Sequence, residues 1–236
     1  MNDEIEYPIR INRYLYLMGY CSRRQADKYI EKGMVQINGK KAVIGQKVQK
    51  NDAIELSKVI KKLPESYEYY AFNKPIGIVS HNPQKSERSI EHIFNKKVDL
   101  FPLGRLDKAS HGLMILTNDG TIVDKILNPK NAHEKEYSVK VDKELKPSFE
   151  RKMAKGVKIE EYITKPAKVK VKGKRLFDIT LTEGKKHQIR RMGAALGYQV
   201  IDLKRTRIMN IRLGSLPEGK GRPLTPKEKF DLLKRT

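Results

Sequence analysis

The sequence predicts an α+β protein of two unequal domains, and three observations support this fold class. Residues 9–56 show the compact order of two helices followed by a hairpin. Residues 57–67 follow no periodic pattern and contain three lysines and one proline, which is typical of a linker. Beyond the linker, strand and helix patterns do not alternate regularly, which favours a largely antiparallel sheet over a doubly wound fold. We place the domain boundary near residue 62, between domains of residues 1–62 and 63–236.

The charge balance indicates a polyanionic partner. The 236 residues carry a formal net charge of +22, and the isoelectric point is about 9.9. An anionic membrane is the weaker alternative to nucleic acid, since no apolar run approaches the roughly 18 residues of a spanning helix and the N-terminus has no signal-peptide pattern. Cys21 is the only cysteine, which excludes an intrachain disulfide and favours a reducing compartment. We expect a cytoplasmic nucleic-acid-binding protein with no membrane partner.

The first domain has well-defined helix ends and a hairpin turn. Ser22 is a favourable N-cap, and Gln25 three residues later completes the capping-box pattern. Gly33 stands where a left-handed C-cap is expected. Asn38-Gly39 follows an alternating apolar run and is a strong hairpin signal. Five cations surround these elements: Arg23, Arg24, Lys28, Lys40 and Lys41.

The second domain mixes strands and helices. The apolar run Leu113–Leu116 predicts a buried strand. In "KEYSVKV", Tyr137, Val139 and Val141 alternate on one face, which predicts a second strand. A further pair of strands is expected within residues 166–184, and helices are expected within 117–129, 146–156, 185–197 and 224–235.

Two possible ligand motifs fail. "GSLPEGKG" has the glycine and lysine spacing of a phosphate-binding P-loop, but Gly221 stands where Ser or Thr must hold magnesium. The five histidines, at positions 81, 92, 111, 133 and 187, have no metal-ligand spacing among themselves or with Cys21. We therefore expect neither a nucleotide site nor a metal site, and we assign the histidines to surface or hydrogen-bonding roles.

Four segments in order, "FNKPIG", "PLGRLDKASHGLMILTNDG", "KEY" and "EGKKHQIRRM", resemble the RsuA-type ribosomal RNA pseudouridine synthases. The first domain resembles the S-four type (alpha-L) RNA-binding domain that these enzymes carry at the N-terminus. Within the family, "RTRIMN" and "CSRRQADKYIE" are most similar to the RluF-type enzymes of large-subunit ribosomal RNA. The resemblance covers residues 9–235 and implies a catalytic domain with a largely antiparallel mixed β-sheet flanked by helices.

The reaction implied by the resemblance explains the absence of cofactor motifs. The change from uridine to pseudouridine breaks the bond between base nitrogen and sugar, turns the uracil and rejoins it through a ring carbon. No oxidation or net group transfer occurs, so no cofactor is expected. A carboxylate can either attack the electron-deficient sugar carbon or abstract a proton next to it. Asp107 matches the essential aspartate of the family, and the sequence does not decide between these two first steps.

The resemblance also implies partners for Asp107. Arg190 matches the arginine that the family pairs with the aspartate, whereas Arg191 points about 100° away on the same helix and is left to RNA or solvent. Tyr137 matches the active-site tyrosine, whose ring can stack on a flipped uracil. Arg105 is expected to contact RNA at the vacated base position, with a structural salt bridge as the competing role.

Other residues are assigned to binding or support. Lys74 and Pro75 match the motif that shapes the cleft floor, and Ile208 is a candidate for the wall of the uracil pocket. Gly104 and Gly112 are expected to permit the turn that presents Asp107. In the first domain, Arg23, Arg24 and Lys28 are expected to contact RNA phosphates.

Several alternatives remain at this stage. The leading hypothesis is a pseudouridine synthase that acts on ribosomal RNA, with the large subunit favoured. A synthase that acts on transfer RNA, and a non-catalytic RNA-binding factor in ribosome assembly, are the alternatives. The target uridine is not readable from the sequence, because phosphate contacts carry no base information. We expect a monomer.

Overall fold

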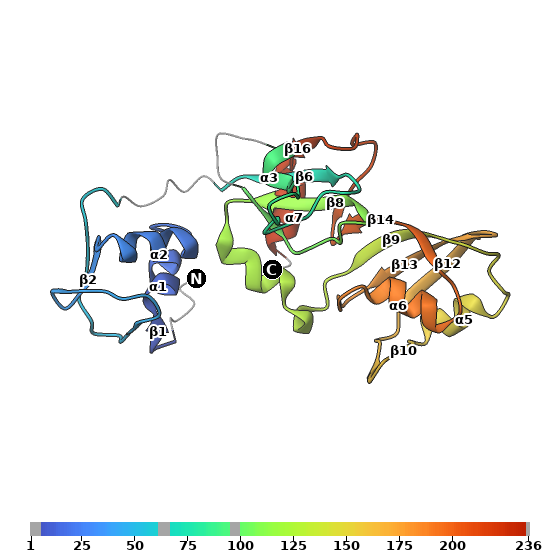
Figure 1. The fold of residues 1–236 in the computed structure, drawn as a ribbon, viewed down its shortest axis with the longest axis horizontal. Coiled ribbons are helices and arrows are strands. Elements are labelled where there is room, and N and C mark those ends of the chain that lie inside the picture. Colours follow the sequence, from blue (N-terminus) through green and yellow to red (C-terminus); the bar gives the residue numbers. More distant parts are fainter. Residues whose placement is uncertain (1–5, 61–66, 95–99, 235–236) are drawn as a thin grey trace. The chain divides into compact units, whose positions relative to one another are not determined.

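The computed structural model describes residues 6–60, 67–94 and 100–234 (Figure 1). The chain folds as two compact units, residues 1–67 and residues 68–236. The boundary expected near residue 62 falls within residues 61–66, outside the described residues. The two units are therefore treated separately, as unit 1 and unit 2.

Unit 1 contains two short helices followed by small antiparallel strands. Its elements are β1 (Ile9–Arg10), α1 (Ile11–Leu17), α2 (Arg23–Glu31), β2 (Val35–Ile37), β3 (Lys40–Lys41), β4 (Lys47–Val48) and β5 (Ile54–Leu56). The N-cap expected at Ser22 is confirmed, because its hydroxyl accepts a hydrogen bond from the Gln25 N–H at 3.2 Å. Gly33 has φ +66° after α2, and Asn38 and Gly39 have φ +53° and +74° between β2 and β3. The helix end and the hairpin are thus also confirmed.

Unit 2 is built on one twisted, mixed sheet. The sheet's strands are β6 (Tyr69–Lys74), β7 (Phe101–Leu103), β8 (His111–Thr117), β9 (Lys135–Val141), β12 (Lys168–Gly173), β13 (Leu176–Leu181), β14 (Val200–Ile208), β15 (Ile211–Arg212) and β16 (Gly221–Pro223). A separate hairpin pairs β10 (Lys158–Ile159) with β11 (Tyr162–Ile163). The sheet order is β12-β13-β9-β14-β8-β6-β16, with β7 added beside β8 and β15 beside β14 (Figure 1). Only the pairing of β14 with β8 is parallel in this described sheet. The predicted α+β class with a largely antiparallel mixed sheet is confirmed.

Helices cover both halves of this sheet. They are α3 (Ile90–Ile93), α4 (Val123–Leu127), α5 (Phe149–Ala154), α6 (Gln188–Ala195) and α7 (Pro226–Lys234), with 3-10 turns at Gly120–Ile122 and Pro129–Asn131. The expected helix after Thr225 is confirmed, and its N-terminus is closed by two reciprocal hydrogen bonds between Thr225 and Glu228.

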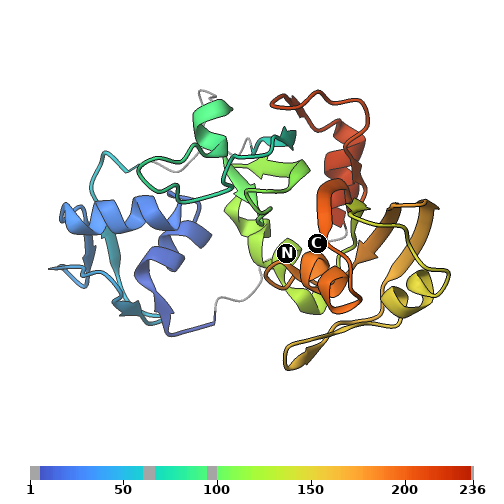
Figure 2. The same cartoon turned by 45° about the vertical axis from the view of Figure 1, so that its right-hand side comes forward.

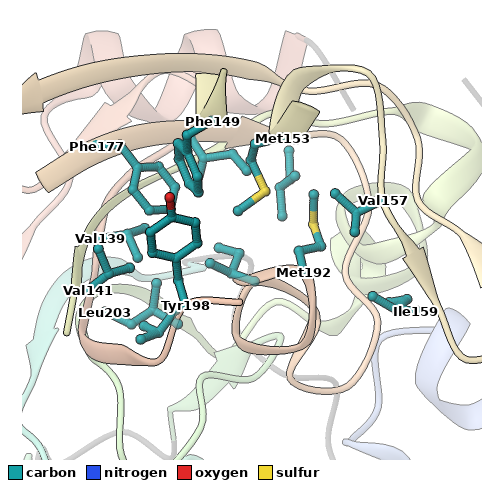
Figure 3. Packing of buried hydrophobic residues seen from close by; sticks show 14 residues of the cluster. Val139, Val141, Phe149, Met153, Val157, Ile159, Phe177, Met192, Tyr198 and Leu203 are labelled. Atoms are coloured by element: carbon teal, nitrogen blue, oxygen red, sulfur yellow. The ribbon is translucent and has the colours of Figure 1, made fainter. Parts of the chain in front are cut away.

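Two clusters of buried apolar side chains, among the described residues of unit 2, lie on either side of the β14–β8 pair. One cluster joins α5 and α6 to β9, β13 and β14, and these two helices lie together in both views (Figures 1 and 2). Its centre holds Phe149, whose ring packs edge-on against Phe177 at 4.8 Å and Tyr198 at 5.0 Å between centroids (Figure 3). The other cluster joins β6, β8 and α3 through Phe72, Met114 and Ile90. The sheet therefore supports two packed halves that meet where β8 and β14 run side by side.

Candidate active site

Asp107 lies on the loop between β7 and β8, which we call the aspartate loop (residues 104–110). Gly104 at its start has φ +83°, a conformation that glycine adopts without steric cost. The Ser80 hydroxyl donates to the Leu106 carbonyl at 2.7 Å and accepts from the Leu106 N–H at 3.0 Å. The Asp107 carbonyl accepts from the Ser110 N–H at 3.0 Å, which closes the turn. The loop is thus held by its backbone, while 37% of the Asp107 side chain stays exposed.

Lys74 lies beneath the aspartate loop and has no exposed surface. Its Nζ donates to the Ser110 carbonyl at 2.8 Å and to the Pro75 carbonyl at 2.9 Å. Burial lowers the pKa of Lys74 to about 8, and the nearby charge of Arg205 acts in the same direction. The expected substrate contact by Lys74 has no open path in this arrangement, and the lysine holds the end of the loop instead.

Arg190 projects from the first turn of α6 toward the same loop. Its guanidinium donates to the Val200 carbonyl at 2.8 Å and to the Ala109 carbonyl at 2.9 Å. It forms no ion pair with Asp107 in the described structure, so the pairing that the resemblance implied is not present here. Arg191 also differs from expectation, because it pairs with Glu160 at 2.5 Å. The partner carboxylate belongs to Glu160, whose side chain is exposed.

Arg205 on β14 is a site residue that the sequence reasoning missed. It is 3% exposed, and its Nε donates to the Leu113 carbonyl at 2.7 Å. Its Nη1 donates to the Arg105 carbonyl, which is part of the aspartate loop, at 3.3 Å. The signal available was the segment "RTRIMN", whose first arginine is Arg205 and whose resemblance to a known enzyme type had been noted.

Three neighbouring strands bring the aspartate loop close to Tyr137. Arg205 pairs with Gly112 of β8 on one side and with Tyr137 of β9 on the other. Gly112 has φ +104°, and a Cβ atom there would lie 2.4 Å from the Arg205 carbonyl oxygen. The half-buried Tyr137 packs into the cluster that contains Leu106, the residue before Asp107. The close approach of β8 and β14 at Gly112 thus sets the spacing between loop and tyrosine.

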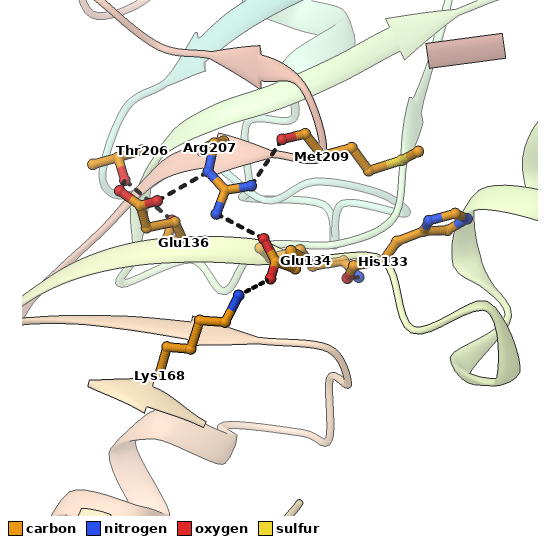
Figure 4. Close-up of polar contacts among 8 residues, drawn as sticks. His133, Glu134, Glu136, Lys168, Thr206, Arg207 and Met209 are labelled. Carbon is orange, nitrogen blue, oxygen red and sulfur yellow. Dashed lines mark hydrogen bonds and ion pairs between the residues drawn. The ribbon is translucent and has the colours of Figure 1, made fainter. Parts of the chain in front are cut away.

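Glu134, just before β9, and Glu136 within it bind an arginine of β14 beside the backbone of Tyr137 (Figure 4). Arg207 donates through Nε to Glu136 at 2.9 Å and through Nη2 to Glu134 at 3.1 Å. Lys168 on β12 donates to the same Glu134 at 2.7 Å, and this hydrogen bond lowers the pKa of Glu134. This network ties β9, β12 and β14 together on the sheet face opposite the Tyr137 side chain, because Glu136 and Tyr137 are consecutive residues of β9.

The two remaining candidates in unit 2 lie in contrasting surroundings. Arg105 is exposed and makes no ion pair with any residue that the structure describes, so its competing role as a structural salt bridge has no support. Ile208 is 3% exposed at the end of β14. It lies three residues beyond Arg205, or roughly 10 Å along the strand. Its place in a uracil pocket stays a prediction.

His187 is the second residue that the sequence reasoning missed. It is the N-cap of α6, and its Nε2 lies 3.6 Å from Oδ1 of Asp107. The expected surface position of this histidine is confirmed, since half of its side chain is exposed, but its closeness to Asp107 was not expected. Its signal was its place in the quoted segment "EGKKHQIRRM", three residues before Arg190.

In unit 1, the predicted phosphate contacts lie on the solvent face of α2. Arg23, Arg24 and Lys28 are exposed, whereas Ala26 and Ile30 are buried on the opposite face. Lys40 and Lys41 of the hairpin are exposed as well. The structure therefore leaves this helix face open to a polyanion.

Comparisons with known proteins identify the fold and the chemistry. A family model described as RNA pseudouridylate synthase matches residues 68–195, and a model for the S4 domain matches residues 9–54.

The chain belongs to the RNA pseudouridylate synthase family.

The synthase is similar to known proteins over almost its whole length. The dual-specificity RNA pseudouridine synthase RluF of Escherichia coli (strain K12) is 45% identical over 96% of this chain and 79% of its own. Ribosomal large subunit pseudouridine synthase B of Bacillus subtilis (strain 168) is 35% identical over 93% of both chains. A crystal structure of a pseudouridylate synthase, 33% identical, aligns with a TM-score of 0.72 over 95% of this chain and 99% of its own. The resemblance drawn from the sequence is thereby confirmed.

Family membership makes the synthase an enzyme that isomerises uridine in RNA, with RNA as its partner. The non-catalytic alternative is set aside on this ground. Among the described residues, no helix is long and apolar enough to cross a membrane.

Proposed function

We propose that the synthase converts a specific uridine of large-subunit ribosomal RNA into pseudouridine, with Asp107 as the reacting group. The observation that carries the chemistry is a half-exposed carboxylate on a loop whose backbone is fixed by Lys74, Arg190 and Arg205. Catalysis requires a group that is both accessible and rigidly placed. The names of the relatives, RluF and ribosomal large subunit synthase B, support the choice of RNA.

The geometry fits either first step of the isomerisation. The Asp107 carboxylate either attacks the sugar carbon that bonds the base or removes a proton from the adjacent carbon, and the bond to the uracil nitrogen breaks. The freed uracil turns and bonds to the sugar carbon through its C5 atom. As this bond forms, the ester between Asp107 and the sugar breaks in the first case, and the removed proton returns to the adjacent carbon in the second. The hydrogen on C5 then leaves as a proton. Tyr137, close to the loop, stacks on the flipped base, and Arg105 contacts the RNA from which the base was removed.

The cations of α2 supply sequence-independent affinity in this proposal. Arg23, Arg24 and Lys28 contact phosphates, so binding weakens steeply as salt rises. In this proposal unit 2 selects the target uridine, because its loops contact the bases. The proposal includes a cytoplasmic location and a monomeric enzyme.

The test is a pseudouridine map of all ribosomal RNA from a strain that lacks the gene. We expect one or a few large-subunit positions to remain uridine, and to be restored by the wild-type gene but not by one that encodes Asp107→Asn. A complete set of large-subunit pseudouridines in the deletion strain would contradict the proposal.

A second substrate class is favoured by one observation. The RluF relatives are named dual-specificity enzymes, so we include transfer RNA as a second candidate substrate. The same map, extended to transfer RNA, tests it: a transfer RNA position lost together with the ribosomal position supports dual use, and an unchanged transfer RNA map contradicts it.

A further inference from the structure

The cations around the aspartate loop are committed to backbone carbonyls. Lys74 bonds to the Pro75 and Ser110 carbonyls, and Arg205 bonds to the Leu113 and Arg105 carbonyls. Arg190 likewise holds the loop through the Ala109 carbonyl. These groups fix the position of the loop but leave the direction of its carboxylate open.

His187 is the side chain that lies at ion-pair distance from that carboxylate among the described residues. The distance from its Nε2 to Oδ1 of Asp107 is 3.6 Å, and half of its side chain is exposed. It therefore borders the same open space into which the Asp107 side chain projects.

The backbone of His187 is held in an unusual conformation. Its φ of +51° and ψ of +29° are left-handed, a conformation that is unfavourable for a non-glycine residue. The next residue keeps it there: the buried Gln188 side chain donates to Glu183 at 2.6 Å and accepts from the Lys185 N–H at 2.9 Å. Such strain persists where the surrounding structure fixes it, and it fixes the direction of the imidazole.

We infer that His187 is a positioning residue that orients the Asp107 carboxylate toward the target nucleotide. The inference rests on the proposed function in that Asp107 is taken as the reacting group. The imidazole restricts rotation of the carboxylate from the side of α6, and the positive end of that helix favours the same placement. A misplaced reacting group loses much of its rate, even when the substrate binds normally.

His187→Gly is the sharpest variant, because glycine accepts the left-handed backbone and leaves an imidazole-sized space beside Asp107. We expect kcat to fall about 10- to 100-fold with KM changed less than about threefold. Added imidazole should restore most of the lost kcat in His187→Gly. In His187→Asn, which also tolerates this backbone but fills the space, imidazole should restore nothing. The readout is release of tritium from RNA labelled at C5 of uridine.

His133→Asn is the matched control, because His133 is half-buried and its Nε2 contacts the Lys125 carbonyl instead of Asp107. It should keep the wild-type kcat. Wild-type kcat in His187→Gly, or a loss that imidazole does not restore, would overturn the inference and leave His187 with a backbone role. The assay uses whichever RNA class the wild-type enzyme modifies, so failure of the ribosomal proposal is seen separately, in the wild-type protein.

Discussion

The cations of α2 and the cations around Asp107 are the same residue types in opposite surroundings. On α2, Arg23 and Lys28 are exposed on the face opposite the core. Around the aspartate loop, Lys74 and Arg205 are buried, and they donate to backbone carbonyls. The cations of α2 can therefore bind phosphates, whereas the buried cations already bind carbonyl oxygens of the protein.

This difference shows that the net charge of +22 does not report a single function. Exposed cations raise affinity for RNA through release of counterions, and their effect depends on salt. Buried cations act at short range on a few carbonyl oxygens, and salt screens them little. Substitutions made in each region separately test this division of roles.

The largest effect is expected at the carboxylate that the buried cations support. Asp107→Asn keeps the size of the side chain but removes both its charge and its ability to attack or to accept a proton. Turnover should fall at least about 1,000-fold, as measured by tritium release. RNA binding, measured by filter retention, should stay within about threefold. Turnover close to wild type would remove Asp107 from the chemistry.

The next effect tests the close approach of β8 and β14. In Gly112→Ala, the new methyl group would lie 2.4 Å from the Arg205 carbonyl oxygen, and the backbone has φ +104°. We expect about 3 kcal/mol of lost stability, measured by urea unfolding, together with reduced kcat. Gly214→Ala is the control: it also has a left-handed backbone, but nothing lies within 4 Å of the new Cβ. Equal losses in both variants would show that the approach to Arg205 is unimportant.

A smaller effect concerns the buried charge of Lys74. Its pKa is about 8 in the fold, against 10.5 for an ordinary lysine, so above pH 8 the unfolded chain binds more protons than the folded one. The stability of the wild type relative to Lys74→Met should therefore rise between pH 8 and 10, by about 2 kcal/mol, and should be flat below pH 8. Urea unfolding of both proteins across this range measures the difference. If the stability difference between the two proteins does not change with pH, the pKa of Lys74 is not lowered by burial.

Local signals explain which parts of the fold were predictable. The helix end at Gly33, the hairpin at Asn38-Gly39 and the strand from Leu113 to Leu116 depend on neighbouring residues, and all three were expected and found. The central strand β14 carries no comparable signal, because alternation in a strand that buries an arginine does not separate apolar from polar residues. Its parallel pairing with β8 joins segments about 90 residues apart, which no local pattern reports.

The same distinction between local signals and long-range contacts applies to the residues of the candidate site. Asp107 and Tyr137 were predicted as site residues because each stands in a motif that resembles a known family. Arg205 and His187 were missed because their roles depend on partners that only the fold brings near: backbone carbonyls in one case and the Asp107 carboxylate in the other. The expected ion pair of Arg190 with Asp107 failed for a related reason, since the carbonyls of Val200 and Ala109 occupy its guanidinium.

The smallest expected effect tests the comparison of the two regions most directly. It is the salt dependence of kcat/KM for three proteins: the Arg23→Gln, Arg24→Gln, Lys28→Gln triple variant, a control triple variant and Lys74→Met. The control changes Lys47, Lys50 and Lys58 to Gln, which removes the same charge from exposed positions of unit 1 outside α2.

The α2 variant should raise KM about tenfold near physiological salt and lower the slope of log(kcat/KM) against log[salt] by roughly 2, with kcat unchanged. Lys74→Met should lower kcat with the slope unchanged, and the control should change neither. If the control lowers the slope as much as the α2 variant does, or if the α2 variant lowers kcat at an unchanged slope, the division of the cations between RNA binding and support of Asp107 is contradicted.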